Sequence, residues 1–310
     1  MSIATRSAFG ETVAKLGETN PNIVVLDADL SKSTMSKFFA KQFPERFFEM
    51  GIAEANMIGT ASGLAFSGKI PYICSFACFL TGRFDQIRLS IGYSGANVRL
   101  VGTHSGIAIG EDGYSQMGLE DIALMKSIPE MVVIQPADGE ETKQAVEYLT
   151  NHHQGPAYLR LTRQKVPAVT DRVSNYEFKL GKPVTLRKGE NIAIIATGGV
   201  VHESLKAAEK LQASGINPTV VNLHTIKPLD PSFFRELTET HRTLITVEDH
   251  QLDGGVGESI SALVSELNPT RIFRIGVRNV YGESGSPEEL YKKYQLDADG
   301  IAKQIAGWLK

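Results

Sequence analysis

Short apolar runs that alternate with helix-forming segments constrain the fold of this 310-residue chain more than any other feature. In the first half, buried strands are predicted at 22–26, 72–75, 98–102, 131–135 and 157–161. The second half repeats the pattern, with strands at 192–196, 218–223, 243–247 and 271–275. Strands that alternate with helices form parallel sheets covered by helices on both faces. The sequence therefore predicts an α/β protein with two doubly wound domains and mainly parallel sheets.

The boundary between the two domains is predicted from a rise in polarity. From Asp171 to Glu190 the chain contains no long apolar run. We therefore predict a first domain at 1–170, a linker at 171–188 and a second domain at 189–310. Near the end of the chain, Ser286 before Pro287 and Asp297 before an apolar segment are typical of helix N-termini.

Composition excludes several classes of function. The net charge is −3 and 42% of the residues are hydrophobic, which gives no reason to expect nucleic acid or a membrane surface as a partner. Cys74 and Cys78, four residues apart, could be a redox pair or two metal ligands. Because no other cysteine and no nearby histidine accompanies them, we interpret both as buried residues of a cytoplasmic protein. We predict no metal site on this chain.

One acidic residue, Glu54, stands in an otherwise uncharged stretch at 50–57. It begins a predicted helix, and residues 58–68 that follow carry no charge, so we expect this helix to be buried nearly all round. A buried carboxyl group favours the protonated form, which can donate a hydrogen bond, whereas a helix N-terminus favours the carboxylate. A carboxylate satisfied by backbone amides is therefore the alternative interpretation of Glu54.

Two aromatic residues and several polar ones lie near predicted strand ends, where α/β folds bind ligands. Phe76 and Phe79 could stack against a flat heteroaromatic ring, or they could simply pack in the core. A glycine-rich loop at 103–116 contains His104, Asp112 and Gln116. Such a loop suits a hydroxyl-rich substrate, although a solvated polar loop is an equally good interpretation.

Four residues could together form an anion site, because guanidinium groups match the geometry of phosphate. They are Arg6, Ser33, His104 and Arg163. Each of them alone could instead be a surface ion pair or a helix cap. The glycine runs at 198–199 and 254–257 match neither a dinucleotide-binding fingerprint nor a P-loop, and we interpret them as tight turns.

Taken in order along the whole chain, these segments resemble the carboxyl-terminal half of transketolase. The resemblance runs through GIAEANMIGTASGLA, FDQIRLS, GEDGYSQMGLED, QPADGEET, LTRQKVP, VEDH and GGVGE. It implies a pyrimidine-binding domain followed by a C-terminal domain. It also implies that the protein uses thiamine diphosphate to transfer a two-carbon ketol unit from a ketose phosphate to an aldose phosphate, as in the pentose phosphate pathway.

The resemblance assigns roles to particular residues. Glu54 matches the acid that hydrogen-bonds the aminopyrimidine of the cofactor, and Phe79 matches the ring stacked on it. The other implied cofactor contacts are Phe76, Asp29 and Ile52. Implied substrate-binding residues are Arg6, Ser33, His104, Asp112, Gln116 and Arg163. Glu54 and His104 are the predicted catalytic residues.

Some features depart from the family pattern. Gln116 stands where some relatives have histidine, and Gly82 stands where some have an aromatic residue. The GDG motif through which the family holds the diphosphate and its divalent cation is absent from the sequence. We therefore expect a split transketolase, in which a separate amino-terminal subunit supplies Mg²⁺ or Ca²⁺ and completes the site in an α2β2 heterotetramer.

Three alternatives remain open on the sequence. The β subunits of 2-oxo acid dehydrogenases share the two-domain layout but act on unphosphorylated substrates. The carboxyl-terminal half of deoxyxylulose-phosphate synthase is closer, although the segment at 110–121 fits transketolase better. An inactive paralogue that only binds a partner is the alternative that is not an enzyme.

Overall fold

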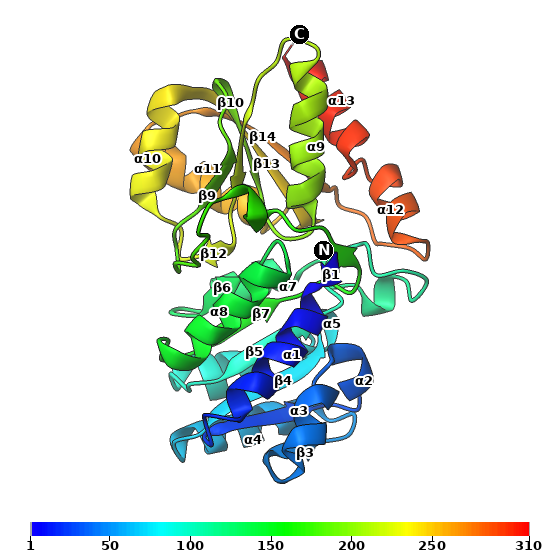
Figure 1. Ribbon diagram of the computed structural model, residues 1–310, viewed down its shortest axis with the longest axis vertical. Helices are drawn as coiled ribbons and strands as arrows, with labels where there is room; N and C mark the ends of the chain where they lie inside the picture. The colour runs from blue at the N-terminus through cyan, green and yellow to red at the C-terminus, as the bar shows by residue number, and fades with distance from the viewer. Residues whose placement is uncertain (1, 310) are drawn as a thin grey trace.

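The computed structural model describes residues 2–309, which form two α/β domains stacked along the long axis of the molecule (Figure 1). The chain begins at the junction between them, builds the lower domain first, and then builds the upper domain (Figure 1). The predicted fold class is confirmed, because both sheets are mainly parallel and have helices on their faces.

The first domain is built on a seven-stranded sheet in the order β12-β6-β7-β5-β4-β2-β3. Its strands are β2 (Ile23–Asp27), β3 (Phe47–Glu49), β4 (Ile70–Phe76), β5 (Arg99–Thr103), β6 (Val132–Ile134), β7 (Ala157–Arg160) and β12 (Thr225–Lys227). All neighbours pair in parallel except β12, which comes from the second half of the chain and pairs antiparallel with β6. The interior strands β2 and β5 are buried throughout, which fits the apolar residues at the centre of each.

Helices cover both faces of this sheet. They are α1 (Thr5–Gly17), α2 (Ser31–Thr34), α3 (Lys37–Gln42), α4 (Glu54–Phe66), α5 (Ala77–Thr81), α6 (Phe84–Gln86), α7 (Asp121–Ser127) and α8 (Gly139–Asn151). One apolar core joins Phe9 of α1 to Val146 of α8, and the core on the other face contains Ile58 of α4. Asp138 begins α8 by accepting the backbone N–H of Glu141. A two-stranded sheet of β1 (Ile3–Ala4) and β8 (Lys165–Val166) closes the domain.

The second domain has a five-stranded sheet in the order β14-β13-β10-β11-β9. Its elements are β9 (Val184–Arg187), β10 (Asn191–Ala196), α9 (Val200–Gln212), β11 (Thr219–Asn222), α10 (Pro231–Thr240), β13 (His241–Gln251), α11 (Val256–Leu267), β14 (Arg271–Val277), α12 (Pro287–Lys293) and α13 (Ala298–Trp308). Helices α10 and α11 lie on one side of the sheet and α9 and α13 on the other (Figure 1). The edge strand β9 lies within the segment predicted as a linker.

The helix starts predicted near the end of the chain are confirmed. Ser286 and Glu289 form a reciprocal capping box at α12, and Asp297 accepts the backbone N–H of Gly300 at α13. The helix predicted at 84–91 is only partly correct, because the backbone widens into a π-helix at Ile87–Tyr93 after the short α6.

Two expectations about burial are wrong. Helix α4 is not buried nearly all round, because Asn56, Gly59, Gly63 and Phe66 face solvent along one side of it. The apolar and small residues on this side of α4 therefore form part of the molecular surface and do not pack into the core. Cys78 is half-buried, although Cys74 is fully buried as expected. Both cysteines are free.

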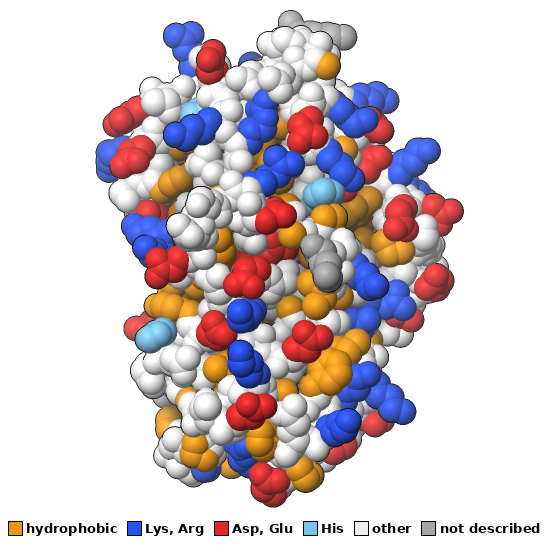
Figure 2. All heavy atoms as spheres, in the orientation of Figure 1, with side chains coloured by type: hydrophobic (Ala, Val, Ile, Leu, Met, Phe, Trp, Pro, Cys, Tyr) orange, Lys and Arg blue, Asp and Glu red, His pale blue; other side chains and the backbone are white. Residues whose placement is uncertain are grey.

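The visible surface carries acidic and basic side chains interspersed over both domains (Figure 2). Within residues 2–309, no helix combines the length and the hydropathy that crossing a bilayer requires.

Candidate active site

The topology of the first sheet gathers the predicted site residues along one edge. Parallel strands end on the same side of a sheet, and ligands bind beyond these carboxyl ends. Neighbouring strands in the order β7, β5, β4, β2 and β3 are followed in the sequence by segments that carry the predicted residues. In the same order, these residues are Arg163, His104, Phe79, Asp29 and Glu54.

Glu54 lies at the first position of α4 and is only 6% exposed. Within residues 2–309, its carboxylate accepts no side-chain or backbone hydrogen bond, so backbone capping does not account for it. Neither of its carboxylate oxygens is a fully buried atom left without a partner, so the group still reaches solvent although the residue is mostly buried. The geometry therefore leaves Glu54 available to a group outside this chain.

Three aromatic rings stack in series beside β4. The rings of Phe79 and Phe76 lie 5.4 Å apart between centroids, and the Phe76 ring lies 3.7 Å from the imidazole of His104. Phe76 is buried, whereas Phe79 at the outer end is half-buried. The stack fixes the plane of the Phe79 ring and leaves part of its surface accessible to a further flat ring.

The structure brings together the residues predicted to bind an anion. Arg6 donates to the backbone oxygen of Ser33 at 2.6 Å and approaches His104 Nε2 at 3.4 Å. Arg163 donates to the backbone oxygen of Ile109 at 2.5 Å. Burial lowers the pKa of Arg6, and the charge of Arg163 lowers it further. Two guanidinium groups that repel each other in a partly buried site favour an anionic ligand between them.

His104 is held neutral in this cluster. Burial, followed by the charges of Arg6 and Arg163, lowers the pKa of His104 to about 2. Because arginine can only donate, Nε2 of the imidazole must accept from Arg6. The proton therefore lies on Nδ1, which is 3.0 Å from Thr103 Oγ1. The imidazole presents a lone pair toward the arginine and not a second positive charge.

Other predicted residues lie less tightly. The carboxylate of Asp112 is 3.9 Å from Arg163 Nε and is about one-third exposed. Gln116 ends a single 3₁₀ turn, and within residues 2–309 its side chain has no hydrogen-bond partner. The backbone N–H of exposed Asp29 donates to Glu49. Ile52, just before α4, is 83% exposed.

Asp27 is a residue of this region that we did not predict. It is fully buried at the end of β2, where it accepts hydrogen bonds from Thr34, Ser36 and the backbone N–H of Leu30. Burial raises the pKa of Asp27 to about 6 in spite of these bonds. The bonds shape the turn that carries Asp29. The sequence does contain a signal for Asp27, because it is an acidic residue directly after the strand predicted at 22–26.

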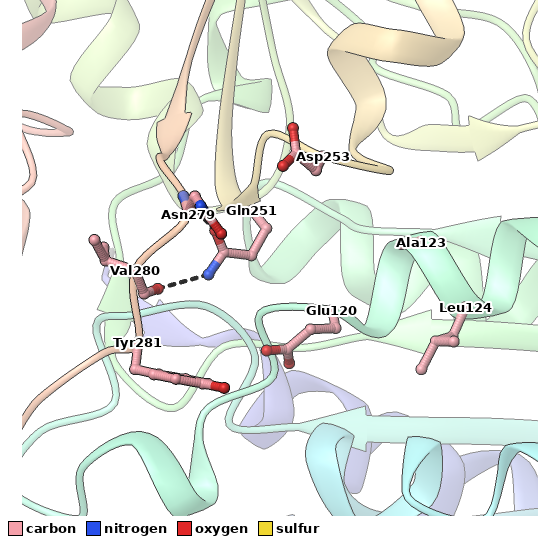
Figure 3. Close-up of a pocket in the computed structure, with 8 residues that line it drawn as sticks. All are labelled: Glu120, Ala123, Leu124, Gln251, Asp253, Asn279, Val280 and Tyr281. Carbon is pink, nitrogen blue, oxygen red and sulfur yellow. Dashed lines mark hydrogen bonds between the residues drawn. The ribbon is translucent and has the colours of Figure 1, made fainter.

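A hollow lies elsewhere, in the crevice between the two domains (Figure 3). Its volume is about 550 Å³, and it is lined by residues such as Leu124, Gln251 and Tyr281. None of the predicted site residues contributes to it. Among residues 2–309, no cluster of three or more potential metal ligands is present.

The fold and the strand-end residues define a two-domain α/β protein with a candidate ligand site along one edge of its first sheet. Residues 1–169 match the model of the transketolase pyrimidine-binding domain, and residues 181–301 match that of the transketolase C-terminal domain. The chain therefore belongs to the transketolase family, as its resemblance implied, and it consists of these two domains.

Individual relatives agree with this assignment. The chain is 43% identical to a putative transketolase C-terminal section of Methanocaldococcus jannaschii over 98% of this chain and 96% of that protein. It is 39% identical to human transketolase, again over 98% of this chain, but spans only 49% of the length of that relative. A solved structure described as a split gene transketolase, inactive beta4 tetramer, is 41% identical, with a TM-score of 0.90 and 98% coverage of both chains.

Proposed function

We propose that this chain is the carboxyl-terminal subunit of a split transketolase, which transfers a two-carbon ketol unit between sugar phosphates. The observation that carries the proposal is the edge of the first sheet, where buried Glu54 lacks a partner and two arginines lie close together. Thiamine diphosphate, when bound, supplies the carbanion chemistry that such a transfer requires.

The residues present fit the cofactor. Glu54 would hold a proton against a ring nitrogen of the pyrimidine, which would give this buried carboxyl group its missing hydrogen bond. The half-buried ring of Phe79 would support the face of the pyrimidine. Asp29, which follows β2, and Ile52, which lies just before α4, would also contact the cofactor.

The substrate would be bound by its phosphate group. Arg6, Arg163 and neutral His104 would take the phosphate, with Ser33 beside them. Asp112 and Gln116 would read hydroxyl groups of the donor sugar. Binding the phosphate away from the reacting carbon orients the sugar for attack. A paired set of arginines favours this function over that of a 2-oxo acid dehydrogenase, whose substrates carry no phosphate.

The proposed partner is an amino-terminal subunit that holds the diphosphate through a divalent cation, in an α2β2 assembly. Helix α4 supports a partner at this place. A Cβ added at Gly59 or Gly63 would meet no atom of this chain within 4 Å, so packing within the chain does not require these glycines. Bare backbone beside Phe66, which is 66% exposed, suits close approach by another subunit.

We place this assembly in the cytoplasm, and the free state of both cysteines is in keeping with that location. Burial raises the pKa of Cys78 to about 12 and that of Cys74 well above its usual range, so neither thiol is a nucleophile here.

The test is reconstitution with the candidate amino-terminal subunit encoded in the same genome. The copurified pair would be assayed with xylulose 5-phosphate and ribose 5-phosphate in the presence of thiamine diphosphate and Mg²⁺. Ketol transfer by the pair, and by neither chain alone, is the expected result. A cofactor-loaded pair that converts pyruvate and no ketose phosphate would transfer the assignment to the 2-oxo acid enzymes, and one that converts neither would indicate an inactive paralogue.

A further inference from the structure

A buried polar contact joins the second domain to the glycine-rich loop of the first. Asp249, near the end of β13, is only 3% exposed. One carboxylate oxygen accepts the backbone N–H of Ile107 at 2.7 Å, and the other accepts the hydroxyl of Tyr291 at 3.0 Å. The loop is thus held by a side chain that lies about 140 residues away in the sequence, in the other domain.

The loop passes so close to Asp249 that it has no room for a side chain. Gly106 has φ +83°, and a Cβ added there would lie 2.1 Å from the Asp249 carboxylate. The position therefore requires glycine for its conformation and for the space that the carboxylate occupies. The close approach therefore fixes the position of the backbone at 106–107 relative to β13.

The far end of the same loop is fixed from the same point. Arg160, buried at the end of β7, donates to the backbone oxygens of both Gly118 and Asp249, at 2.8 and 3.0 Å. Its charge is balanced by Asp121, with a shortest contact of 2.7 Å. Gly106 also donates its N–H to the Gly118 oxygen, which closes the base of the loop. The side chain of Asp249 therefore holds the Ile107 end of the segment 106–118, and its backbone oxygen shares Arg160 with Gly118 at the other end.

Regular secondary structure does not fix the conformation of the segment 106–118. Only a single 3₁₀ turn, at Tyr114–Gln116, interrupts the irregular backbone between β5 and α7. His104, Gly106, Gly110 and Gly113 all have positive φ angles, so the segment follows no helix or strand path. The position of Asp112 therefore depends on the contacts that hold this segment, which include Asp249 at Ile107 and Arg163 at Ile109.

We propose that Asp249 is a positioning residue for the sugar-binding loop, through which the second domain sets the affinity for the ketose donor. The proposal rests on the proposed function, because it treats the loop as part of the sugar site. Displacement of the loop by about 1 Å is enough to lower the efficiency of a reaction that depends on orientation. The second domain then takes part in substrate binding without touching the substrate.

The experiment compares four variants in the reconstituted complex. Asp249→Leu keeps much of the side-chain volume and removes both acceptors, and Asp249→Ala removes them with the volume. Asp249→Asn keeps an oxygen that can accept from Ile107. Tyr291→Phe removes only the other hydrogen bond of the same carboxylate. The Leu and Ala variants should raise KM for the ketose phosphate about tenfold or more, which is the effect expected when a hydrogen bond to a charged group is lost. The change in kcat should be smaller. Asn and Phe should stay within about threefold of wild type.

A second readout does not depend on activity. Hydrogen exchange of the full chain should accelerate at 106–118 in the Leu and Ala variants and remain as in wild type in the Asn and Phe variants. Unchanged exchange and KM in the Leu and Ala variants would overturn the proposal, as would an Asn variant that behaves like Leu. If the wild-type complex transfers no ketol unit, the proposed function fails, and hydrogen exchange alone then decides whether Asp249 anchors the loop.

Discussion

Helix α4 allows a prediction in which one substitution has opposite effects on folding and on assembly. Gly59 lies in the interior of α4 and faces solvent, and a Cβ added there meets no atom within 4 Å. Its backbone angles are helical, so a larger residue fits without strain. Packing within this chain therefore does not require glycine at this position, which a contact with another subunit would explain.

The two magnitudes follow from that environment. Replacing glycine by leucine in an exposed helix interior stabilises the helix by about 0.7 kcal/mol, because leucine loses less backbone entropy on folding. If the partner subunit packs against the bare backbone of α4, the leucine side chain must displace it. Overpacking of this kind costs about 1–3 kcal/mol. The dissociation constant of the two subunits would then rise about 5- to 150-fold.

The assay measures both quantities on Gly59→Leu. Urea unfolding of the isolated chain should show an increased free energy of unfolding, and titration of the amino-terminal subunit should show weaker binding. Gly307→Leu is the matched control, because Gly307 also lies in a helix, α13, with nothing within 4 Å of an added Cβ. A Gly59→Leu chain that is more stable and still binds its partner within twofold of wild type would refute the assignment of α4 to the interface.

Three further predictions concern single groups. Glu54→Gln should lower kcat of the assembled enzyme by about 10²- to 10⁴-fold, the usual contribution of a positioned proton donor, while calorimetry still detects the complex between the two subunits. Arg6→Ala should lower kcat/KM for a ketose phosphate about 10- to 100-fold and leave that for an unphosphorylated ketose nearly unchanged; an equal loss on both substrates would argue against a phosphate site. Complete burial lowers the pKa of His250 to about 4, so the folded state resists protonation there. The stability this group contributes is present above its unfolded pKa of about 6.5 and is lost as the pH falls toward 4, by about 3 kcal/mol. Urea unfolding at pH 7 and pH 4 should show that the free energy of unfolding of His250→Gln falls less between these pH values than that of wild type. An equal fall in both proteins would contradict the proposed contribution of His250.

The sequence predicted the features that depend on local pattern. Apolar runs identified the strands, because a strand buried on both faces has to be apolar throughout. Because the strands of a parallel sheet end on the same side, the sequence also predicts that residues after the strand ends, such as Arg163, His104 and Asp29, share one edge. The structure places Arg6 3.4 Å from His104, and it places Arg163 close enough for its charge to act on both residues, although their separate chemical roles stay predictions.

Features that depend on distant contacts could not be predicted in this way. The apolar sequence of α4 was interpreted as core, because composition does not distinguish an interior face from a surface that another subunit could cover. Likewise, nothing near Asp249 in the sequence indicates that its carboxylate meets Ile107. That contact depends on how the two domains pack, which periodicity within either domain does not report.

Glu54 and the exposed side of α4 are two consequences of one arrangement. The same helix that places an unpartnered carboxyl group at its first residue presents Gly59, Gly63 and Phe66 along its length. A partner that covers this side would also exclude water from the start of the helix, where the cofactor is proposed to bind. Excluding water strengthens the hydrogen bond of a buried acid to its ligand. Cofactor binding and assembly should therefore stabilise each other by the same factor, because coupling between two binding equilibria is reciprocal. If the proposed amino-terminal subunit covers this side, one contact accounts for both the open start of the helix and its exposed apolar side.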